Sequence, residues 1–240
     1  MMNPNTTTAN SSELTIADQT VSQIVSENPN LSRVFQAFDI GFCCQGKLTL
    51  RKACERKGID LQEMIDALEA EGSRATESQI NTAEMSLSEL ASHIVETHHG
   101  FLRSELPRIH AMAERVAQVH GAHTPSLVEV YQVFTEIGQN LAEHARCEEN
   151  TFFPMFAESE NEATEEKLSQ QIDQMVKDHE SIIGEISRLR ELTNGYQPPA
   201  EACNTYRALF AGLADLEADT GRHFHLENNV LFPAALERAS

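Results

Sequence analysis

The chain has 240 residues and a formal net charge of −19, from 18 basic and 37 acidic side chains. This acidic balance argues against nucleic acid as a partner, because phosphate contacts require a basic surface. Hydrophobic residues make up 40% of the composition, which is enough for a packed core, and no apolar run approaches the roughly 20 residues that a membrane-spanning helix needs.

Residues 1–12 are polar and lack the charged and apolar regions of a secretory signal, so we expect a disordered tail there. The five cysteines, an odd number that includes the adjacent pair Cys43 and Cys44, do not resemble a disulfide framework. Reduced thiols in a cytoplasmic compartment fit this pattern better.

Residues 13–71 are predicted to form a small domain of short helices, with Thr15 and Asp60 as N-caps. Residues 72–85 are small and polar and are predicted to be a linker.

Within the small domain, residues 39–46 form a turn that contains two glycines and presents Cys43 and Cys44. The segment 47–57 that follows is basic in an otherwise acidic protein: Lys47, Arg51, Lys52, Arg56 and Lys57. Nearby cations lower the pKa of a thiol, so the pair is either a reactive thiol site or two packing thiols.

Residues 86–240 are predicted to form an up-down-up-down bundle of four long helices, so the fold class is all-α. Ser86 and Glu89 have the spacing of a capping box that opens it. The helices are expected at about 87–119, 124–152, 164–193 and 200–228. Pro107 should kink the first helix, and a Phe-Pro pair should close the second and the fourth with a short final turn.

The second and fourth of these helices repeat one arrangement. Glu148 follows His144 by four residues, Glu227 follows His223 by four, and the proline of a Phe-Pro pair stands ten residues after each histidine. A further histidine precedes each copy, by 45 residues in the first and 44 in the second: His99 and His179. An internal repeat of this size indicates a duplicated helical hairpin.

All six residues fall on apolar stripes with the 3.5-residue spacing of an antiparallel bundle. They are therefore expected to point into one core: His99, His144, Glu148, His179, His223 and Glu227. His98 falls at the edge of its stripe, so His99 is preferred to it. Asp178 and Thr220 could orient imidazoles, although surface and packing roles fit them equally well. The remaining histidines lie off the stripes and are expected in solvent: His93, His110, His120, His123 and His225.

Such a core is hard to keep folded alone, because burying one unpaired carboxylate costs several kcal/mol against a total stability of roughly 5–15 kcal/mol. No Lys or Arg lies on the stripes, so metal is the expected partner. The six residues suit two ions, with two histidines terminal on each and both glutamates bridging. Imidazole and carboxylate suit iron or manganese better than zinc. These ligands leave coordination positions on each ion unfilled, which implies an oxo or hydroxo bridge and an open site. Buried histidines bonded to nearby carboxylates are the weaker interpretation, because the arrangement is duplicated.

The sequence also resembles a known family. The second domain resembles the hemerythrin-like bundles, and residues 13–240 as a whole resemble the di-iron proteins for repair of iron centres, the YtfE/ScdA type. The resemblance rests on five segments: Asp39-Ile-Gly-Phe-Cys-Cys-Gln-Gly-Lys47, His99-Gly-Phe-Leu-Arg-Ser-Glu-Leu-Pro107, His144-x-x-x-Glu148-Glu149, Asp178-His179-Glu180 and Leu226-Glu-Asn-Asn-Val-Leu-Phe-Pro233.

The resemblance implies a cytoplasmic non-haem di-iron protein, induced by nitrosative or oxidative stress, that helps to restore damaged iron–sulfur clusters. Its clients would be iron–sulfur proteins, and the six inward residues would be its iron ligands. Cys43 and Cys44 would receive iron or pass it between the bundle and a client.

Two other functions stay open. One is an enzyme that reduces nitric oxide or a peroxide at the open di-iron site, and the other is a hemerythrin-like sensor or carrier of oxygen. The thiol-bearing domain favours repair over the carrier, as does the symmetric set of four histidines. The sequence does not separate repair from reduction. It leaves the oligomeric state open as well, a homodimer being one arrangement.

Overall fold

The computed structural model describes residues 15–43, 46–72, 82, 85–157 and 165–239. Every regular element in these ranges is helical, apart from one isolated bridge between Thr20 and Thr49. The all-α class predicted from the sequence is confirmed. The expected tail at 1–12 and most of the expected linker at 72–85 lie outside the described residues. Within the described ranges, every helix is too short or too polar to span a bilayer.

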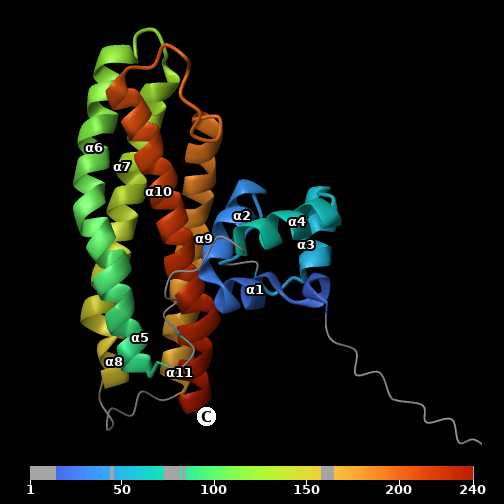
Figure 1. The fold of residues 1–240 in the computed structure, drawn as a ribbon. Helices are drawn as coiled ribbons and strands as arrows, with labels where there is room; N and C mark the ends of the chain where they lie inside the picture. The colour runs from blue at the N-terminus through green and yellow to red at the C-terminus, as the bar shows by residue number, and fades with distance from the viewer. Residues whose placement is uncertain (1–14, 44–45, 73–81, 83–84, 158–164, 240) are drawn as a thin grey trace, which may run out of the picture.

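The first four helices form a small unit beside the bundle (Figure 1). They are α1 Val21–Glu27, α2 Ser32–Ala37, α3 Leu50–Lys57 and α4 Leu61–Gly72. Asp60 caps α4 as predicted, since its Oδ1 accepts from the backbone N–H groups of Gln62 and Glu63. Thr15 precedes only a short 3₁₀ turn and gives it no side-chain cap. The cap of α1 is instead Thr20, which forms a reciprocal box with Gln23.

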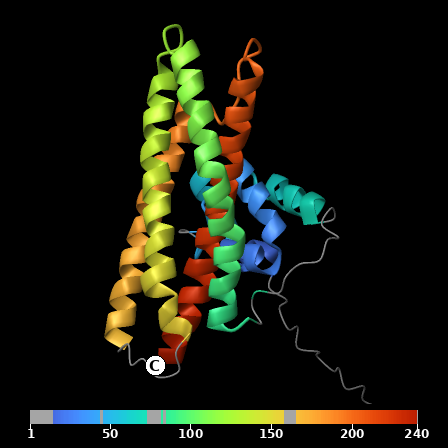
Figure 2. The ribbon, with the colours of Figure 1, turned by 90° about the vertical axis from the view of Figure 1, so that its left-hand side faces the viewer.

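Four long helices form the bundle: α6 Gly100–His120, α7 Ser126–Cys147, α9 Glu165–Leu192 and α10 Asn204–Leu226. In ring order α6 packs on α7, α7 on α9, α9 on α10 and α10 on α6 (Figures 1 and 2). At one end of the bundle lie three shorter helices: α5 Leu87–Ile94, α8 Pro154–Ala157 and α11 Phe232–Ala239. Ser86 and Glu89 make both bonds of the predicted capping box ahead of α5.

The predicted stripes are the buried faces of these helices. On α7 each apolar member is 2% exposed or less: Leu127, Val130, Phe134, Ile137 and Leu141. His144 and Glu148 continue the same stripe and are 5% and 0% exposed. The periodicity of the helix therefore carries polar side chains into the core.

Three π-helical turns, none of them predicted, lie between bundle helices. Val95–His99 joins α5 to α6, Glu148–Phe152 joins α7 to α8, and Glu227–Leu231 joins α10 to α11. A π turn inserts one residue into a helix and is often found at functional sites. Here each turn begins or ends at a residue of the predicted metal set. By contrast, α6 runs through Pro107 without ending, and a kink there stays a prediction.

The short final turn expected at each Phe-Pro pair is present after the first pair, as the four residues of α8, but not after the second. Phe153 and Phe232 donate their backbone N–H groups to the carbonyls of Glu148 and Glu227, five residues earlier. Beyond its π turn, α10 continues for 8 residues as α11. The proline follows a π turn, where the interrupted α-helical ladder tolerates a residue with no N–H to donate.

The small unit formed by α1 to α4, called the N-terminal unit below, lies against the α9 and α10 side of the bundle (Figures 1 and 2). Its α2 contacts α10, and Arg190 on α9 donates to the carbonyl of Gln36 at 2.8 Å. The unit therefore covers part of the bundle surface that a free four-helix bundle would expose.

Candidate metal centre

Two fully buried carboxylates lie in the core of the bundle. Glu148 and Glu227 each open a π turn, and both are 0% exposed. They continue the buried stripes of α7 and α10, so the fold carries them inward although burial of a carboxylate is costly. The groups around them decide whether that burial is tolerated.

Each carboxylate lies between two imidazoles. Glu148 Oε2 is 3.2 Å from His99 Nε2, and its Oε1 is 3.1 Å from His144 Nε2. In the second copy of the repeat both distances are 3.2 Å, from Glu227 to His179 and to His223. All four rings are 5% exposed or less. The six residues predicted from the stripes therefore lie together.

The donor atoms fall into two groups, in each of which all atoms lie within 4.8 Å of one another: His144, Glu148, His179 and Glu227, and His99, Glu148 and His223. Glu148 belongs to both groups, and Glu227 reaches the second group through its contact with His223. Metal bound here would be held by these imidazole and carboxylate donors, with Glu148 shared between the two groups.

Several facing atoms have no hydrogen bond within the described part of the chain. They are His99 Nε2, both carboxylate oxygens of Glu148, and Glu227 Oε2. The Nε2 atoms of His144 and His179 are 3.0 Å apart. Nitrogen and oxygen lone pairs that converge in this way, buried and unsatisfied, are a donor set for metal ions. The residues present therefore fit a bound metal pair.

In the metal-free chain, protonated imidazole balances the buried carboxylates. Burial lowers the pKa of His144, but Glu148 and Glu227 outweigh it and raise that pKa to about 9. The pKa of His99 is also raised, because Glu148 and Glu149 outweigh its burial. For His223, burial dominates and holds the pKa well below its ordinary value. A cation that binds here near neutral pH must displace a proton from His144.

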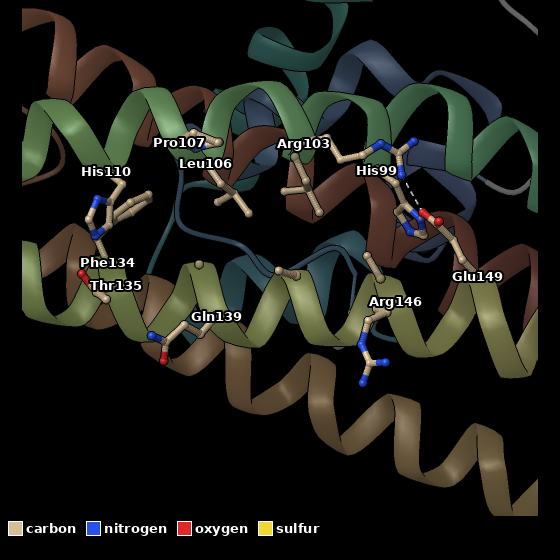
Figure 3. Close-up of a pocket in the computed structure, with 14 residues that line it drawn as sticks. His99, Arg103, Leu106, Pro107, His110, Phe134, Thr135, Gln139, Arg146 and Glu149 are labelled. Carbon is tan, nitrogen blue, oxygen red and sulfur yellow. Dashed lines mark hydrogen bonds and ion pairs between the residues drawn. The ribbon is translucent and has the colours of Figure 1, made fainter.

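The outer ring nitrogens of two imidazoles are held by the residue that follows each glutamate. His99 Nδ1 donates to Glu149 Oε1 at 2.8 Å, a contact visible in Figure 3. His179 Nδ1 donates to Asn228 Oδ1 at 3.0 Å. Partners of this kind fix the orientation and tautomer of a metal-binding histidine. Sequence analysis missed both residues, although Glu149 and Asn228 occupy the same position in the two copies of the repeat.

His98 is buried but lies outside the two donor groups. It is 4% exposed, and its Nδ1 lies 3.0 Å from Asp219 Oδ1. Its ring stacks on that of His223, with centroids 5.3 Å apart and planes 3° from parallel. His99 Nε2, by contrast, faces Glu148, which agrees with the preference for His99 over His98.

The expectation for His225 needs correction, and the structure bears on two roles that the sequence left open, those of Asp178 and Thr220. His225 was expected in solvent but is 3% exposed, because the N-terminal unit covers it and Ser26 Oγ lies 3.1 Å from its Nε2. Asp178 Oδ1 accepts a hydrogen bond from Gln174 on its own helix at 2.8 Å, which favours a role on the helix surface. Thr220 is 1% exposed and its hydroxyl makes no hydrogen bond to a described residue, which favours a packing role.

Cys43 contacts residues that adjoin the candidate centre, whereas Cys44 is outside the described residues. Cys43 is 6% exposed. Its carbonyl accepts from Asn229 Nδ2 at 3.1 Å and from Asn228 Nδ2 at 3.4 Å. Since these residues follow Glu227 directly, the N-terminal unit contacts the candidate centre through its cysteine-bearing turn.

A pocket of about 560 Å³ lies between α6 and α7 and reaches His99 (Figure 3). Its lining is largely apolar and includes Leu102, Leu106 and Phe134. At the His99 end, Arg103 Nη1 donates to Glu149 Oε1 at 2.7 Å. The pocket therefore borders one side of the candidate centre at His99, whose ring is 1% exposed.

Two models of known families match this chain. The model ScdA_N, described as a domain of unknown function (DUF542), matches residues 17–72. The model described as the hemerythrin HHE cation binding domain matches residues 90–235, more than half of the chain. The cation that this description names agrees with the two donor groups.

Curated relatives match over most of their own length. The iron-sulfur cluster repair protein ScdA of Staphylococcus haemolyticus is 31% identical over 212 residues, which cover 88% of this chain and 95% of that protein. A probable iron-sulfur cluster repair protein of Haemophilus influenzae is 30% identical over 93% of this chain and 99% of its own. The iron-sulfur cluster repair protein YtfE of Escherichia coli is 32% identical over 91% of this chain and 97% of its own.

Metal binding should release protons near neutral pH. Metal binds neutral imidazole, whereas His144, with a pKa of about 9, is protonated in the metal-free chain below that pH. The apparent affinity should therefore rise as the pH increases toward 9 and fall as it decreases. Calorimetric titration with Mn²⁺ or Fe²⁺ in two buffers of different ionisation enthalpy measures the protons released. Binding at pH 7.5 without proton release would contradict the assignment of His144 as a ligand.

Proposed function

This chain belongs to the hemerythrin-like family of iron–sulfur cluster repair proteins, and from that premise we propose that it restores damaged clusters by supplying iron from its buried site. The observation that carries the proposal is the convergence of four imidazoles and two carboxylates in two donor groups that share Glu148. The clients are iron–sulfur proteins that have lost iron under nitrosative or oxidative stress.

The metal in this proposal is iron, with two ions in each chain. Imidazole and carboxylate ligands without thiolate suit iron or manganese. Glu148 and Glu227 would bridge the ions, and the imidazoles would divide into two pairs: His144 with His179, and His99 with His223. Bound iron would supply both the cargo for repair and one-electron chemistry.

Cys43 and Cys44 form the proposed thiol site that passes iron from the bundle to a client. Two observations support it. The Cys43 carbonyl is bonded to the residues that follow Glu227, and exposed basic side chains of α3 lie in the same small unit. Nearby cations favour the thiolate, which is the form that binds metal. We place this reaction in the cytoplasm, where thiols stay reduced.

The first prediction concerns metal content. Purified protein should contain about two irons per chain, as in other di-iron bundles. Glu227→Ala removes a carboxylate that contacts an imidazole of each pair, so both ions should be weakly held and most iron lost on gel filtration. His98→Gln, outside the donor groups, should keep both ions. Plasma mass spectrometry measures the content, and zinc alone or no metal in the unaltered protein would reject the iron site.

The second prediction tests repair directly. Iron-loaded protein is incubated with a cluster enzyme damaged by nitric oxide, and the recovery of enzyme activity and the loss of iron from the protein are followed together. Both should proceed in parallel. The double variant Cys43→Ala, Cys44→Ala should keep its iron but restore the enzyme more slowly, whereas Cys203→Ala, an exposed cysteine, should match the unaltered protein. Recovery without iron loss would exclude donation, and full repair by the double variant would exclude the thiol step.

A second candidate function, reduction of nitric oxide, is favoured by the pocket between α6 and α7. Its mainly apolar lining ends at His99, a member of one donor group. A small, weakly polar molecule in this pocket would lie beside His99, at the edge of one donor group. Repair and reduction would then use the same metal from different sides.

Filling the pocket should separate these two functions. A Cβ added at Gly138 comes no closer than 3.8 Å to Leu106 Cδ2, so Gly138→Leu can project into the pocket without a backbone clash. We expect several-fold slower nitric oxide consumption, unchanged iron content and unchanged cluster repair. Gly184→Leu, at an exposed glycine on α9 with open space around it, is the matched control. Nitric oxide consumption at the original rate by Gly138→Leu would exclude the pocket as the route.

A further inference from the structure

One side chain joins the N-terminal unit to the candidate metal centre. We propose that Asn228 is a positioning residue through which the Cys43 loop, residues 39–43, sets the tautomer of His179 and hence how firmly the ion on that side is held. The inference rests on the metal site of the proposed function and adds a means of controlling it. Three features carry it: the confinement of the His179 ring, the two ends of the Asn228 amide, and the seating of the loop.

The His179 ring is confined to one plane. Phe224 stacks on it with centroids 3.9 Å apart and planes 13° from parallel, and Phe232 lies 5.9 Å away at the same angle. The ring is 0% exposed, and its Nε2 faces Glu227 at 3.2 Å. Stacking fixes the plane of the ring but not which nitrogen carries the proton. That choice depends on the partners of both nitrogens: Nε2 faces the donor groups, and Nδ1 faces Asn228, the partner that lies outside them.

The Asn228 amide has a donor end and an acceptor end, and its other partner decides which end faces His179. Nδ2 lies 3.4 Å from the Cys43 carbonyl, a group that can only accept. This contact directs the NH₂ toward Cys43 and leaves Oδ1 toward His179 at 3.0 Å. Oδ1 then accepts a proton from Nδ1, so the lone pair of Nε2 is free for a metal. A rotated amide would direct its NH₂ to Nδ1 and favour the tautomer with the proton on Nε2, which cannot bind metal.

The loop that supplies the Cys43 carbonyl is seated on a glycine of α10. A Cβ added at Gly221 would lie 2.7 Å from Cζ of Phe42, so the Phe42 ring fits there only because Gly221 has no side chain. Asn229 Nδ2 also donates to the Cys43 carbonyl, at 3.1 Å. The carbonyl position thus depends on the packing of Phe42, and any group that lifts the loop also removes the contact between Cys43 and Asn228.

The equivalent histidine in the other half of the repeat has no such dependence. His99 Nδ1 donates to Glu149, and a carboxylate accepts whichever of its oxygens is presented. Arg103 holds that carboxylate at 2.7 Å. The N-terminal loop therefore influences the His179 side of the centre and leaves the His99 side unaffected. A client or an ion that engages Cys43 and Cys44 and lifts the loop would weaken one ion at the moment of transfer.

The test lifts the loop without altering any member of the donor groups. Gly221→Ala should displace Phe42, and Phe42→Ala is a second variant with the same purpose. Each should speed the release of one of the two irons to an Fe²⁺ chelator by roughly 10–100-fold, the usual effect of losing a partner of a metal-bound histidine. Asn228→Ala should do the same. Gly184→Ala, at a glycine on α9 with open space around it and away from the loop, is the control and should release iron at the original rate.

A rescue variant and a metal-free measurement complete the test. Asn228→Asp presents only acceptors to His179, so adding it to Gly221→Ala should restore slow release. Long-range ¹H–¹⁵N spectra of the metal-free chain, at a pH where the His179 ring is neutral, should show the proton on Nδ1 in the unaltered protein and a mixture in Gly221→Ala. An unchanged tautomer after Phe42 is displaced would overturn the coupling even if the chain binds no iron. Equal acceleration by Gly184→Ala and Asn228→Ala would also overturn it.

Discussion

The structure depends on one electrostatic constraint, the presence of two carboxylates in a core that excludes water. Glu148 and Glu227 are 0% exposed, and the ion-pair contacts that the described residues offer them all come from imidazoles. An isolated buried carboxylate would cost a large fraction of the stability of the whole domain. The fold therefore has to bring positive charge to this point, as imidazolium in the metal-free chain or as metal ions. The raised pKa of His144 is a result of this constraint, because two nearby carboxylates raise that pKa more than burial lowers it.

The two halves of the repeat meet this constraint differently. On one side, the ring of His99 is bonded to a carboxylate that stays ionised, because His99 and Arg103 lower the pKa of Glu149 more than its burial raises it. That side adjoins the pocket between α6 and α7. On the other side, the ring of His179 is bonded to the neutral amide of Asn228, which also reaches the N-terminal unit. The two copies of the repeat thus differ: one adjoins a mainly apolar pocket, and the other contacts the cysteine-bearing N-terminal unit.

The parts of the fold that repeat along the chain could be predicted, and the parts that depend on contacts between distant segments could not. The inward placement of His144 followed from the stripe of α7, since one helical period covers both the apolar residues and the histidine. The covering of His225 was missed because an off-stripe position is solvated only in a bundle that stands alone, and here the N-terminal unit packs on it. The π turns were missed because a single inserted residue leaves the apolar pattern on either side intact. The Phe-Pro pairs, which suggested helix ends, mark these turns instead.

The π turns also have a consequence for protein engineering. One extra residue in a helix rotates everything beyond it by about 100° relative to a regular helix. Because Glu148 and Glu227 stand at the start of such turns and His99 at the end of one, part of the site's geometry is stored in the backbone register. Grafting the six side chains onto regular α-helices would reproduce the ligand types but lose the rotation between the helical segments before and after each π turn. A faithful transplant has to carry the inserted residues as well.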